Sequence, residues 1–227
     1  MLFRDRSHAG RTLAATLAGR VGGEDVLVLG VPRGGVVVAD EVARSLGAEL
    51  DIIVPRKLRA PQNPELAIGA VAEDGSLYLD ERSLWALRVD RSYVDQEAAF
   101  QIAEIQRRLR AYRGDRPPPR ITGRTVVLVD DGIATGSTMI AAVRSVRSRG
   151  AARVIVAVPV APPEGVQRLE READEVVCVH EDPYFVAVGQ FYEDFRQVSD
   201  EEVRAILQAA WRRGRQGTDG ERRDDRG

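Results

Sequence analysis

One run of thirteen residues, Val126-Val-Leu-Val-Asp-Asp-Gly-Ile-Ala-Thr-Gly-Ser-Thr138, constrains the fold more than any other part of the chain. Its first four residues are branched and apolar, which is typical of a strand that is buried on both faces. The pattern becomes helical from about Ser137 to Arg149. A buried strand that passes through a short polar loop into a helix is the repeating unit of a parallel α/β sheet, so the run predicts that architecture.

The rest of the chain repeats this alternation of short apolar runs and helical patterns. Core strands are predicted at Val26–Leu29, Asp51–Val54, Thr125–Val129, Val154–Val160 and Glu175–Val179. Helices are predicted at residues 8–20, 36–46, 137–149 and 162–172, and from Ser199 onward, where Glu202 completes a capping box. We therefore expect an α/β fold in which a mostly parallel sheet is flanked by helices on both faces.

A segment of about residues 58–120 interrupts the alternation and predicts an insertion. Two short runs, Leu66–Val71 and Ser76–Leu79, are separated by a turn that contains Asp-Gly, which is a strong hairpin signal. A long helix is predicted over Ser92–Tyr112, because its apolar residues recur every three or four positions. The insertion can act as a loop that closes over a site, or as a packing or dimer element, and the sequence leaves both open.

Composition narrows the class of protein. The net charge of −2 does not favour a nucleic-acid or membrane-surface binder, and the only cysteine, Cys178, excludes a disulfide within the chain. We expect a cytoplasmic protein without a signal peptide or membrane span. One domain is predicted over residues 1–211, followed by a tail over residues 212–227 that has no apolar periodicity and is predicted to be disordered.

The loop Ala134–Thr138 predicts an anion site. Backbone N–H groups at the start of a helix bind phosphate, and Thr135, Ser137 and Thr138 add hydroxyl groups. The glycine spacings match neither a Walker A loop nor a dinucleotide fingerprint. The adjacent Asp130 and Asp131 can accept hydrogen bonds from a ribose diol, contact Mg²⁺, or cap the turn. A sugar with a 5′-phosphate fits both halves of the run.

This run resembles the motif that binds 5-phosphoribosyl-1-pyrophosphate (PRPP) in type I phosphoribosyltransferases, and the similarity extends over roughly Val21–Val198. The resemblance implies that Asp130 and Asp131 hold the ribose hydroxyls and that Ala134, Thr135, Gly136, Ser137 and Thr138 hold the 5′-phosphate. It also implies Mg²⁺, held mainly by PRPP and in part by the two aspartates. One departure is Gly132, where the family usually has a branched apolar residue.

The resemblance places the pyrophosphate on two further segments. Val31–Gly34 matches the family's pyrophosphate loop, so Pro32, Arg33 and Gly34 would contact the leaving group. Arg56 and Lys57 match a pair that follows the next core strand in several members. Lys57 is the only lysine among 33 basic residues, which favours a specific role for its compact ammonium group. The residues implied in catalysis are Asp130, Asp131, Lys57 and Arg33.

The acceptor is less well defined. The family grips its base with a small hood, which here corresponds to residues 180–198, and Tyr184 or Phe185 could stack on a flat ring. The aromatic spacing loosely resembles hypoxanthine-guanine enzymes. Those enzymes carry an acid at the position of Ala134 and a lysine in the hood, and this chain has neither. His180 could also touch the acceptor.

The leading hypothesis is a Mg²⁺-dependent phosphoribosyltransferase of nucleotide salvage, which transfers phosphoribosyl from PRPP to a ring nitrogen of a nucleobase-like acceptor. The resemblance also implies a homodimer. The alternative is a PRPP-binding regulator or sensor without catalytic activity. A PRPP synthase or amidotransferase is a third reading, but the sequence offers neither an amidotransferase nucleophile nor a second nucleotide site.

Overall fold

Five parallel strands form the main sheet of the computed structural model, which describes residues 2–21 and 25–224. Their order is β2-β1-β6-β7-β8. The strands are β1 (Val26–Gly30), β2 (Glu49–Ile52), β6 (Thr125–Val129), β7 (Arg153–Ala161) and β8 (Glu175–Glu181). All five overlap the predicted runs, although β2 begins and ends two residues earlier than the predicted Asp51–Val54. The predicted parallel α/β fold is confirmed.

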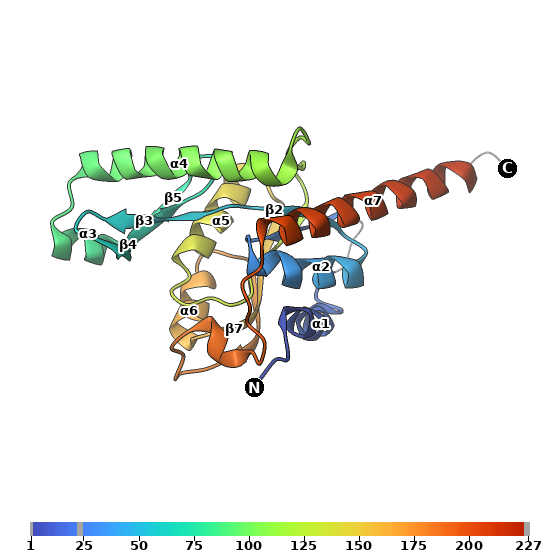
Figure 1. Ribbon diagram of the computed structural model, residues 1–227, viewed down its shortest axis with the longest axis horizontal. Coiled ribbons are helices and arrows are strands. Elements are labelled where there is room, and N and C mark those ends of the chain that lie inside the picture. The colour runs from blue at the N-terminus through green and yellow to red at the C-terminus, as the bar shows by residue number, and fades with distance from the viewer. Residues whose placement is uncertain (1, 22–24, 225–227) are drawn as a thin grey trace.

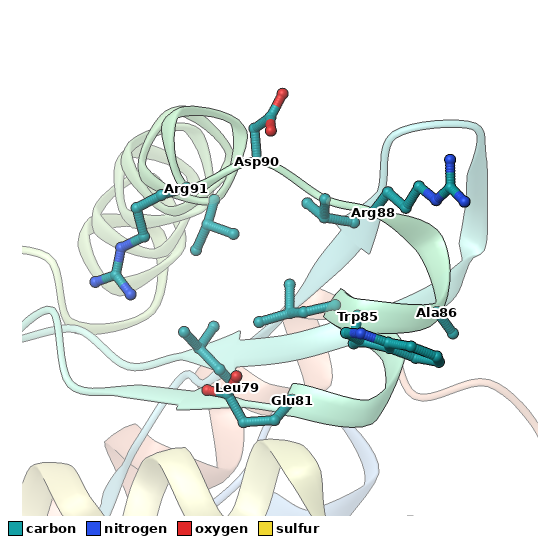
Figure 2. A pocket seen from close by; sticks show the side chains of 10 residues that line it. Leu79, Glu81, Trp85, Ala86, Arg88, Asp90 and Arg91 are labelled. Atoms are coloured by element: carbon teal, nitrogen blue, oxygen red, sulfur yellow. The ribbon is translucent and has the colours of Figure 1, made fainter.

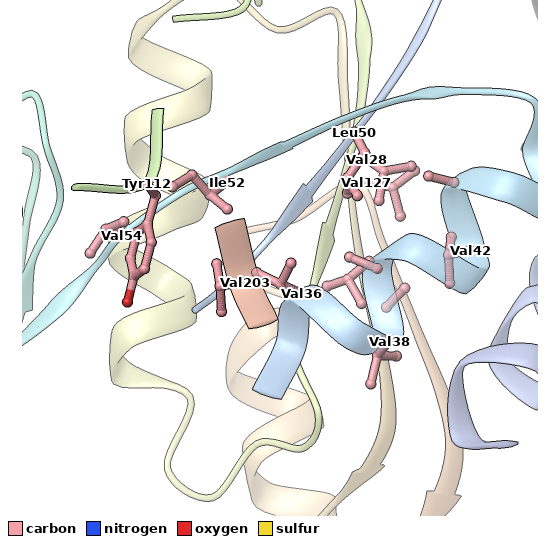
Figure 3. Close-up of a cluster of buried hydrophobic side chains, with 14 of the residues drawn as sticks. Val28, Val36, Val38, Val42, Leu50, Ile52, Val54, Tyr112, Val127 and Val203 are labelled. Atoms are coloured by element: carbon pink, nitrogen blue, oxygen red, sulfur yellow. The ribbon is translucent and has the colours of Figure 1, made fainter. Parts of the chain in front are cut away.

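Helices cover both faces of this sheet. On one face lie α1 (Arg6–Leu17), α2 (Gly34–Leu46) and the first part of α7 (Asp200–Asp224), and on the other lie α5 (Ser137–Ser148) and α6 (Pro163–Leu169). In Figure 1, α1 and α2 lie to the right of this sheet and α5 and α6 to its left. Successive strand residues point to opposite faces. Val28 and Val127 therefore pack with Val36 of α2 (Figure 3), whereas Leu128 packs with Met139 of α5 on the other face.

The insertion contains a second, antiparallel sheet of three strands. The strands of this sheet are β3 (Arg56–Ala60), β4 (Asn63–Val71) and β5 (Leu77–Leu79), and the insertion also contains the helices α3 (Glu81–Leu87) and α4 (Arg91–Arg113). The predicted hairpin and long helix are confirmed, but β3 and α3 were not predicted. Leu58 and Ile68 pack with Ile105 of α4, and Ala70 packs with Ala141 of α5, so the small sheet lies between these two helices.

The last helix begins with the predicted capping box. Ser199 N donates to Glu202 Oε2 over 2.8 Å, and Glu202 N donates to Ser199 Oγ over 3.1 Å. α7 runs to Asp224, so the tail predicted from residue 212 begins inside this helix, while residues 225–227 of that prediction lie outside the described residues. In the described part of the chain, no helix has the length and apolar character needed to cross a membrane.

Candidate functional site

The carboxyl ends of β1 and β6 lie side by side and bring two predicted loops together. Gly30 is level with Val129 in the sheet, and Val31 N donates to Val129 O over 2.9 Å. The loop after β1 therefore begins directly beside Asp130 and Asp131. Ligands of parallel α/β sheets bind at this edge, so the candidate site lies here.

Two glycines allow the loop after β1 to touch the aspartates. A Cβ on Gly34 would lie 1.9 Å from Asp131 Oδ2, and a Cβ on Gly35 would lie 2.8 Å from Asp130 Cα. Real Cβ atoms do not approach so closely, so a side chain at Gly34 would displace the Asp131 and Arg6 side chains, and one at Gly35 would displace the backbone at the end of β6. The Pro32–Arg33 peptide bond immediately before them is cis. The loop of Pro32, Arg33 and Gly34 therefore lies at the carboxyl edge of the sheet, beside the aspartates.

Each of the paired aspartates uses one carboxylate oxygen within the protein. Asp130 Oδ1 accepts from Asp131 N over 2.8 Å, and Asp131 Oδ2 accepts from Arg6 Nε over 2.7 Å. Burial, followed by the neighbouring charge of Asp131, raises the pKa of Asp130 well above its ordinary value, and Arg6 opposes this shift. Asp130 Oδ2 and Asp131 Oδ1 take no part in these two hydrogen bonds.

The loop after the aspartates ends at the N-terminus of α5, which has no side-chain cap. Gly136 is the N-cap residue and adopts φ +80°, a left-handed conformation that favours glycine. Thr135 Oγ1 and Ser137 Oγ lie 3.2 Å apart, and Thr138 is half-buried beside them. With no capping side chain, the first backbone N–H groups of this helix are available to an anion.

The three predicted cationic residues are placed differently from one another. Arg33 precedes Gly34 in the loop that approaches the aspartates, but its Nη1 is 3.9 Å from Asp200 of α7. Asp200 also accepts from the Tyr112 hydroxyl over 2.7 Å. Arg56 and Lys57 were expected in a loop after β2, but they belong to β3 of the insertion.

Neighbours in β3 point to opposite faces of the small sheet. Arg56 donates to Gln101 on α4. Lys57 is exposed and lies opposite Ala70, so its side chain shares the face that α5 covers. Of the two, Lys57 is on the side of the helix that begins at the anion loop.

In the hood, the two predicted acceptor residues have different surroundings. Phe185 stacks on Phe191 with ring centroids 5.4 Å apart, so it belongs to the hood's own apolar cluster. Tyr184 is 85% exposed. His180 lies 3.3 Å from Asp182 and edge-on to Phe191. Burial raises the pKa of the Cys178 thiol to about 11, which fits an unreactive core cysteine.

The departure at Gly132 has a packing explanation. A Cβ at this position would lie 2.6 Å from Val188 Cγ1 and 3.0 Å from Val160 Cγ1. Val188 comes from the short helix η1 (Val188–Phe191) of the hood and fills the space that a branched side chain would need. The residue at 132 therefore contacts the hood rather than a ligand.

Three residues at the site escaped sequence reasoning. Arg6 binds Asp131, the Tyr192 hydroxyl donates to the Asp131 carbonyl over 2.6 Å, and Asp200 binds Arg33. Arg6 and Tyr192 lie 125 and 61 positions from their partner, so no local pattern links them. The aromatic spacing of the hood drew attention to the segment that contains Tyr192, but it did not predict the hydrogen bond from Tyr192 to Asp131.

A separate hollow of about 760 Å³ lies in the insertion, between the end of β5, α3 and the start of α4 (Figure 2). Trp85, which is 84% exposed, and Leu79 provide apolar surface there, and Glu81, Arg88 and Arg91 provide charges. It includes none of the residues predicted to bind PRPP, so the strand ends remain the candidate site.

Fold and site together define a parallel α/β protein with paired carboxylates and an uncapped helix N-terminus at the carboxyl edge of its sheet. A family model for the phosphoribosyl transferase domain matches residues 5–196, and the chain belongs to this family. A Mycobacterium tuberculosis protein that carries the name of a phosphoribosyl transferase is 48% identical over 211 residues, covering 93% of this chain and 47% of that protein.

Two further relatives show how far the similarity extends. The crystal structure of TT1426 from Thermus thermophilus has 54% sequence identity and a TM-score of 0.78, and the match covers 91% of this chain and 98% of that one. A uracil phosphoribosyltransferase of Streptomyces griseus is 46% identical over 57 residues, which is 25% of this chain and 27% of that enzyme. The chain spans about half the length of the mycobacterial relative.

Proposed function

We propose that this chain is a Mg²⁺-dependent phosphoribosyltransferase that transfers 5-phosphoribosyl from PRPP to a ring nitrogen of a nucleobase-like acceptor and releases pyrophosphate. One observation carries the proposal: paired carboxylates and an uncapped helix N-terminus follow the same strand, and a glycine loop faces the carboxylates. The family membership of the chain supports it.

Each part of PRPP has a place in this arrangement. The 5′-phosphate would accept hydrogen bonds from the backbone N–H groups and hydroxyls of residues 134–138. The two ribose hydroxyls would donate to Asp130 Oδ2 and Asp131 Oδ1. The pyrophosphate would lie along Pro32, Arg33 and Gly34, with Lys57 as the proposed additional cation. Arg33 would then exchange its long contact with Asp200 for the leaving group.

In the transfer itself, the ring nitrogen donates its electron pair to C1 of the ribose while the C1–O bond to pyrophosphate breaks. The bonding electrons leave with the pyrophosphate oxygen, and the nitrogen then loses its proton. Positive charge develops on the sugar in between, so the site must stabilise the leaving group and keep out water. The hood, with the exposed ring of Tyr184, would cover the acceptor side.

The donor set is compatible with Mg²⁺ that is held largely by the substrate. Carboxylate and phosphate oxygens are the hard ligands that Mg²⁺ prefers, and Asp130 and Asp131 supply carboxylates at the ribose. Within residues 2–21 and 25–224, no group of three or more His, Cys, Asp or Glu could hold a metal ion. When bound, the ion would neutralise charge on the departing pyrophosphate.

The candidate site offers fewer groups that could bind an acceptor than groups that could bind PRPP, and this difference favours one alternative function. Phe185 is committed to the hood's cluster, and Ala134 offers no carboxylate to an incoming base. A catalytically silent PRPP sensor is therefore the second candidate. Cytoplasmic location, a role in nucleotide salvage and a homodimer are part of the leading proposal.

The test is pyrophosphate release from PRPP with Mg²⁺ over a panel of purines, pyrimidines and nicotinate. The double variant Asp130→Asn/Asp131→Asn serves as the blank, and Asp95→Asn, which alters an exposed aspartate on α4, is the matched control. We expect release with one acceptor class, lost in the double variant and kept in the control. Binding of PRPP without release on any acceptor would support the sensor, and no binding at all would refute both.

A further inference from the structure

Arg6 is the most constrained side chain at the site. Only 10% of it is exposed, although it is a charged residue near the start of the described chain. Its Nε donates to Asp131 Oδ2 over 2.7 Å, and its Nη1 donates to the carbonyl of Arg196 over 2.8 Å. The guanidinium also lies 3.9 Å from the centre of the Phe195 ring. Two polar contacts and one stacking contact together fix the plane of the guanidinium.

The segment that carries Arg6 is held by the hood. Phe3 N donates to Phe191 O over 2.7 Å, Glu193 N donates to Phe3 O over 2.8 Å, and Asp194 N donates to Arg4 O over 2.9 Å. The Phe3 side chain is fully buried and packs against Tyr192. Backbone bonds and an apolar anchor therefore place this segment, residues 3–6, independently of the Arg6 side chain.

Arg6 thus joins two parts of the molecule that handle different halves of the proposed reaction. Through Phe195 and Arg196 it is attached to the hood, which would cover the acceptor. Through Asp131 it is attached to the carboxylates that would receive the ribose diol. A Cβ on Gly34 would come within 2.5 Å of Arg6 Nε, so the guanidinium also lies against the pyrophosphate loop.

We propose that Arg6 is a positioning residue for PRPP: it holds the Asp131 carboxylate in the orientation that presents Oδ1 to a ribose hydroxyl. This inference rests on the proposed function and extends it to a residue outside the recognised motif. The contact uses one oxygen of Asp131 and leaves the other for the ligand. The guanidinium also offsets the charge of two adjacent carboxylates at a site that must accept a polyanion.

The experiment measures selectivity for a diol. Calorimetry would compare ribose 5-phosphate with tetrahydrofurfuryl phosphate, which has the same ring and phosphate but no hydroxyls. The variants are Arg6→Met, which keeps length and packing on Phe195, and Arg6→Lys, which keeps the charge. Arg11→Met is the matched control, because Arg11 lies on the same helix and pairs with Glu41 at an exposed position.

We expect Arg6→Met to weaken ribose 5-phosphate binding by roughly 10- to 100-fold, the range for losing a hydrogen bond to a charged group. Tetrahydrofurfuryl phosphate should lose much less affinity, because the anion loop is untouched and this probe feels only the loss of the Arg6 charge. Arg6→Lys should recover part of the selectivity, and Arg11→Met should retain all of it.

Two results would overturn the inference, and they are distinguishable. If Arg6→Met weakens both probes equally, or neither, Arg6 has only a structural role while the phosphoribosyl site stands. If the wild-type protein binds neither probe, the proposed function fails first, and the positioning role fails with it.

Discussion

A methyl group at Gly35 tests the geometry that joins the two loops of the site. In Gly35→Ala, the new carbon would lie 2.8 Å from both Asp130 Cα and Asp130 Oδ1, and 3.0 Å from Val129 O. Two of these three atoms belong to the backbone of β6 and its end, which a rotamer change cannot move. Ordinary contact begins at 3.4 Å, so the loop and the strand end must separate by about 0.6 Å.

The size of the effect follows from that displacement. Overpacking a well-packed contact costs about 1–3 kcal/mol, which in a chain of this length lowers Tm by roughly 2–12 °C. The same shift moves Asp130 relative to the pyrophosphate loop. Because misplacement of about 1 Å can reduce a rate by about 100-fold, we expect PRPP affinity or kcat/KM to fall by roughly 10- to 100-fold.

Calorimetric unfolding and PRPP titration would measure both effects. The control is Gly214→Ala on α7, where a new Cβ meets nothing within 4 Å and alanine favours the helix. Gly214→Ala should leave PRPP binding unchanged and keep or raise Tm. A Gly35→Ala protein with wild-type Tm and wild-type PRPP affinity would refute the close approach of the two loops.

Three further predictions concern the frame around the site. Arg113→Leu removes the partner of Asp51, which is fully buried and 2.8 Å from Arg113. This substitution should lower the free energy of unfolding in urea by about 3–5 kcal/mol. The control Arg110→Leu, at an exposed position of α4, should lower it far less. Burial and the hydrogen bond to Asp200 raise the pKa of Tyr112 to about 12 from an ordinary 10. Because the pKa of Tyr112 is higher in the folded than in the unfolded state, the neutral hydroxyl contributes stability below pH 10, and this contribution is lost as the pH rises toward 12. The free energy of unfolding should therefore fall over this window in the wild type, and should fall less in Tyr112→Phe. Chelation of Mg²⁺ by EDTA should weaken the binding of PRPP much more than the binding of ribose 5-phosphate, because ribose 5-phosphate has no pyrophosphate. Equal losses of affinity for both ligands in titration would contradict the placement of the ion.

Local patterns were sufficient to predict the core of this fold. The main-sheet strands are rich in branched apolar residues, as buried parallel strands are, although β2 reads Glu-Leu-Asp-Ile and contains the buried Asp51. The capping box at Ser199 and the Asp-Gly turn of the insertion are signals within a few residues, and both are present in the structure. A parallel arrangement places the loops after β1 and β6 at the same edge of the sheet, whereas their adjacency depends on the strand order β2-β1-β6-β7-β8.

The insertion was harder to predict because its signals are mixed. β3 reads Arg-Lys-Leu-Arg-Ala and carries register shifts at Arg59, so its apolar residues do not alternate over a useful length. α3 has only seven residues and no fully buried side chain. Such elements depend on packing against α4 and the rest of the small sheet, and single-sequence periodicity does not contain that information.

The contacts of the site that the sequence did not predict are long-range. Nothing near Arg6 indicates that it meets Asp131, because the contact exists only once the hood has folded over the strand ends. In the same way, aromatic spacing marked Tyr184 and Phe185 equally, and only packing on Phe191 separates them.

The close approach of Val188 to Gly132 couples the hood to the binding run. A branched residue at 132 and the present Val188 cannot occupy the same space, so a larger residue at 132 requires Val188 to shift or to be replaced by a smaller residue. Grafting a hood from another family member, in order to give this scaffold a chosen acceptor, would therefore require residue 132 to be replaced together with it.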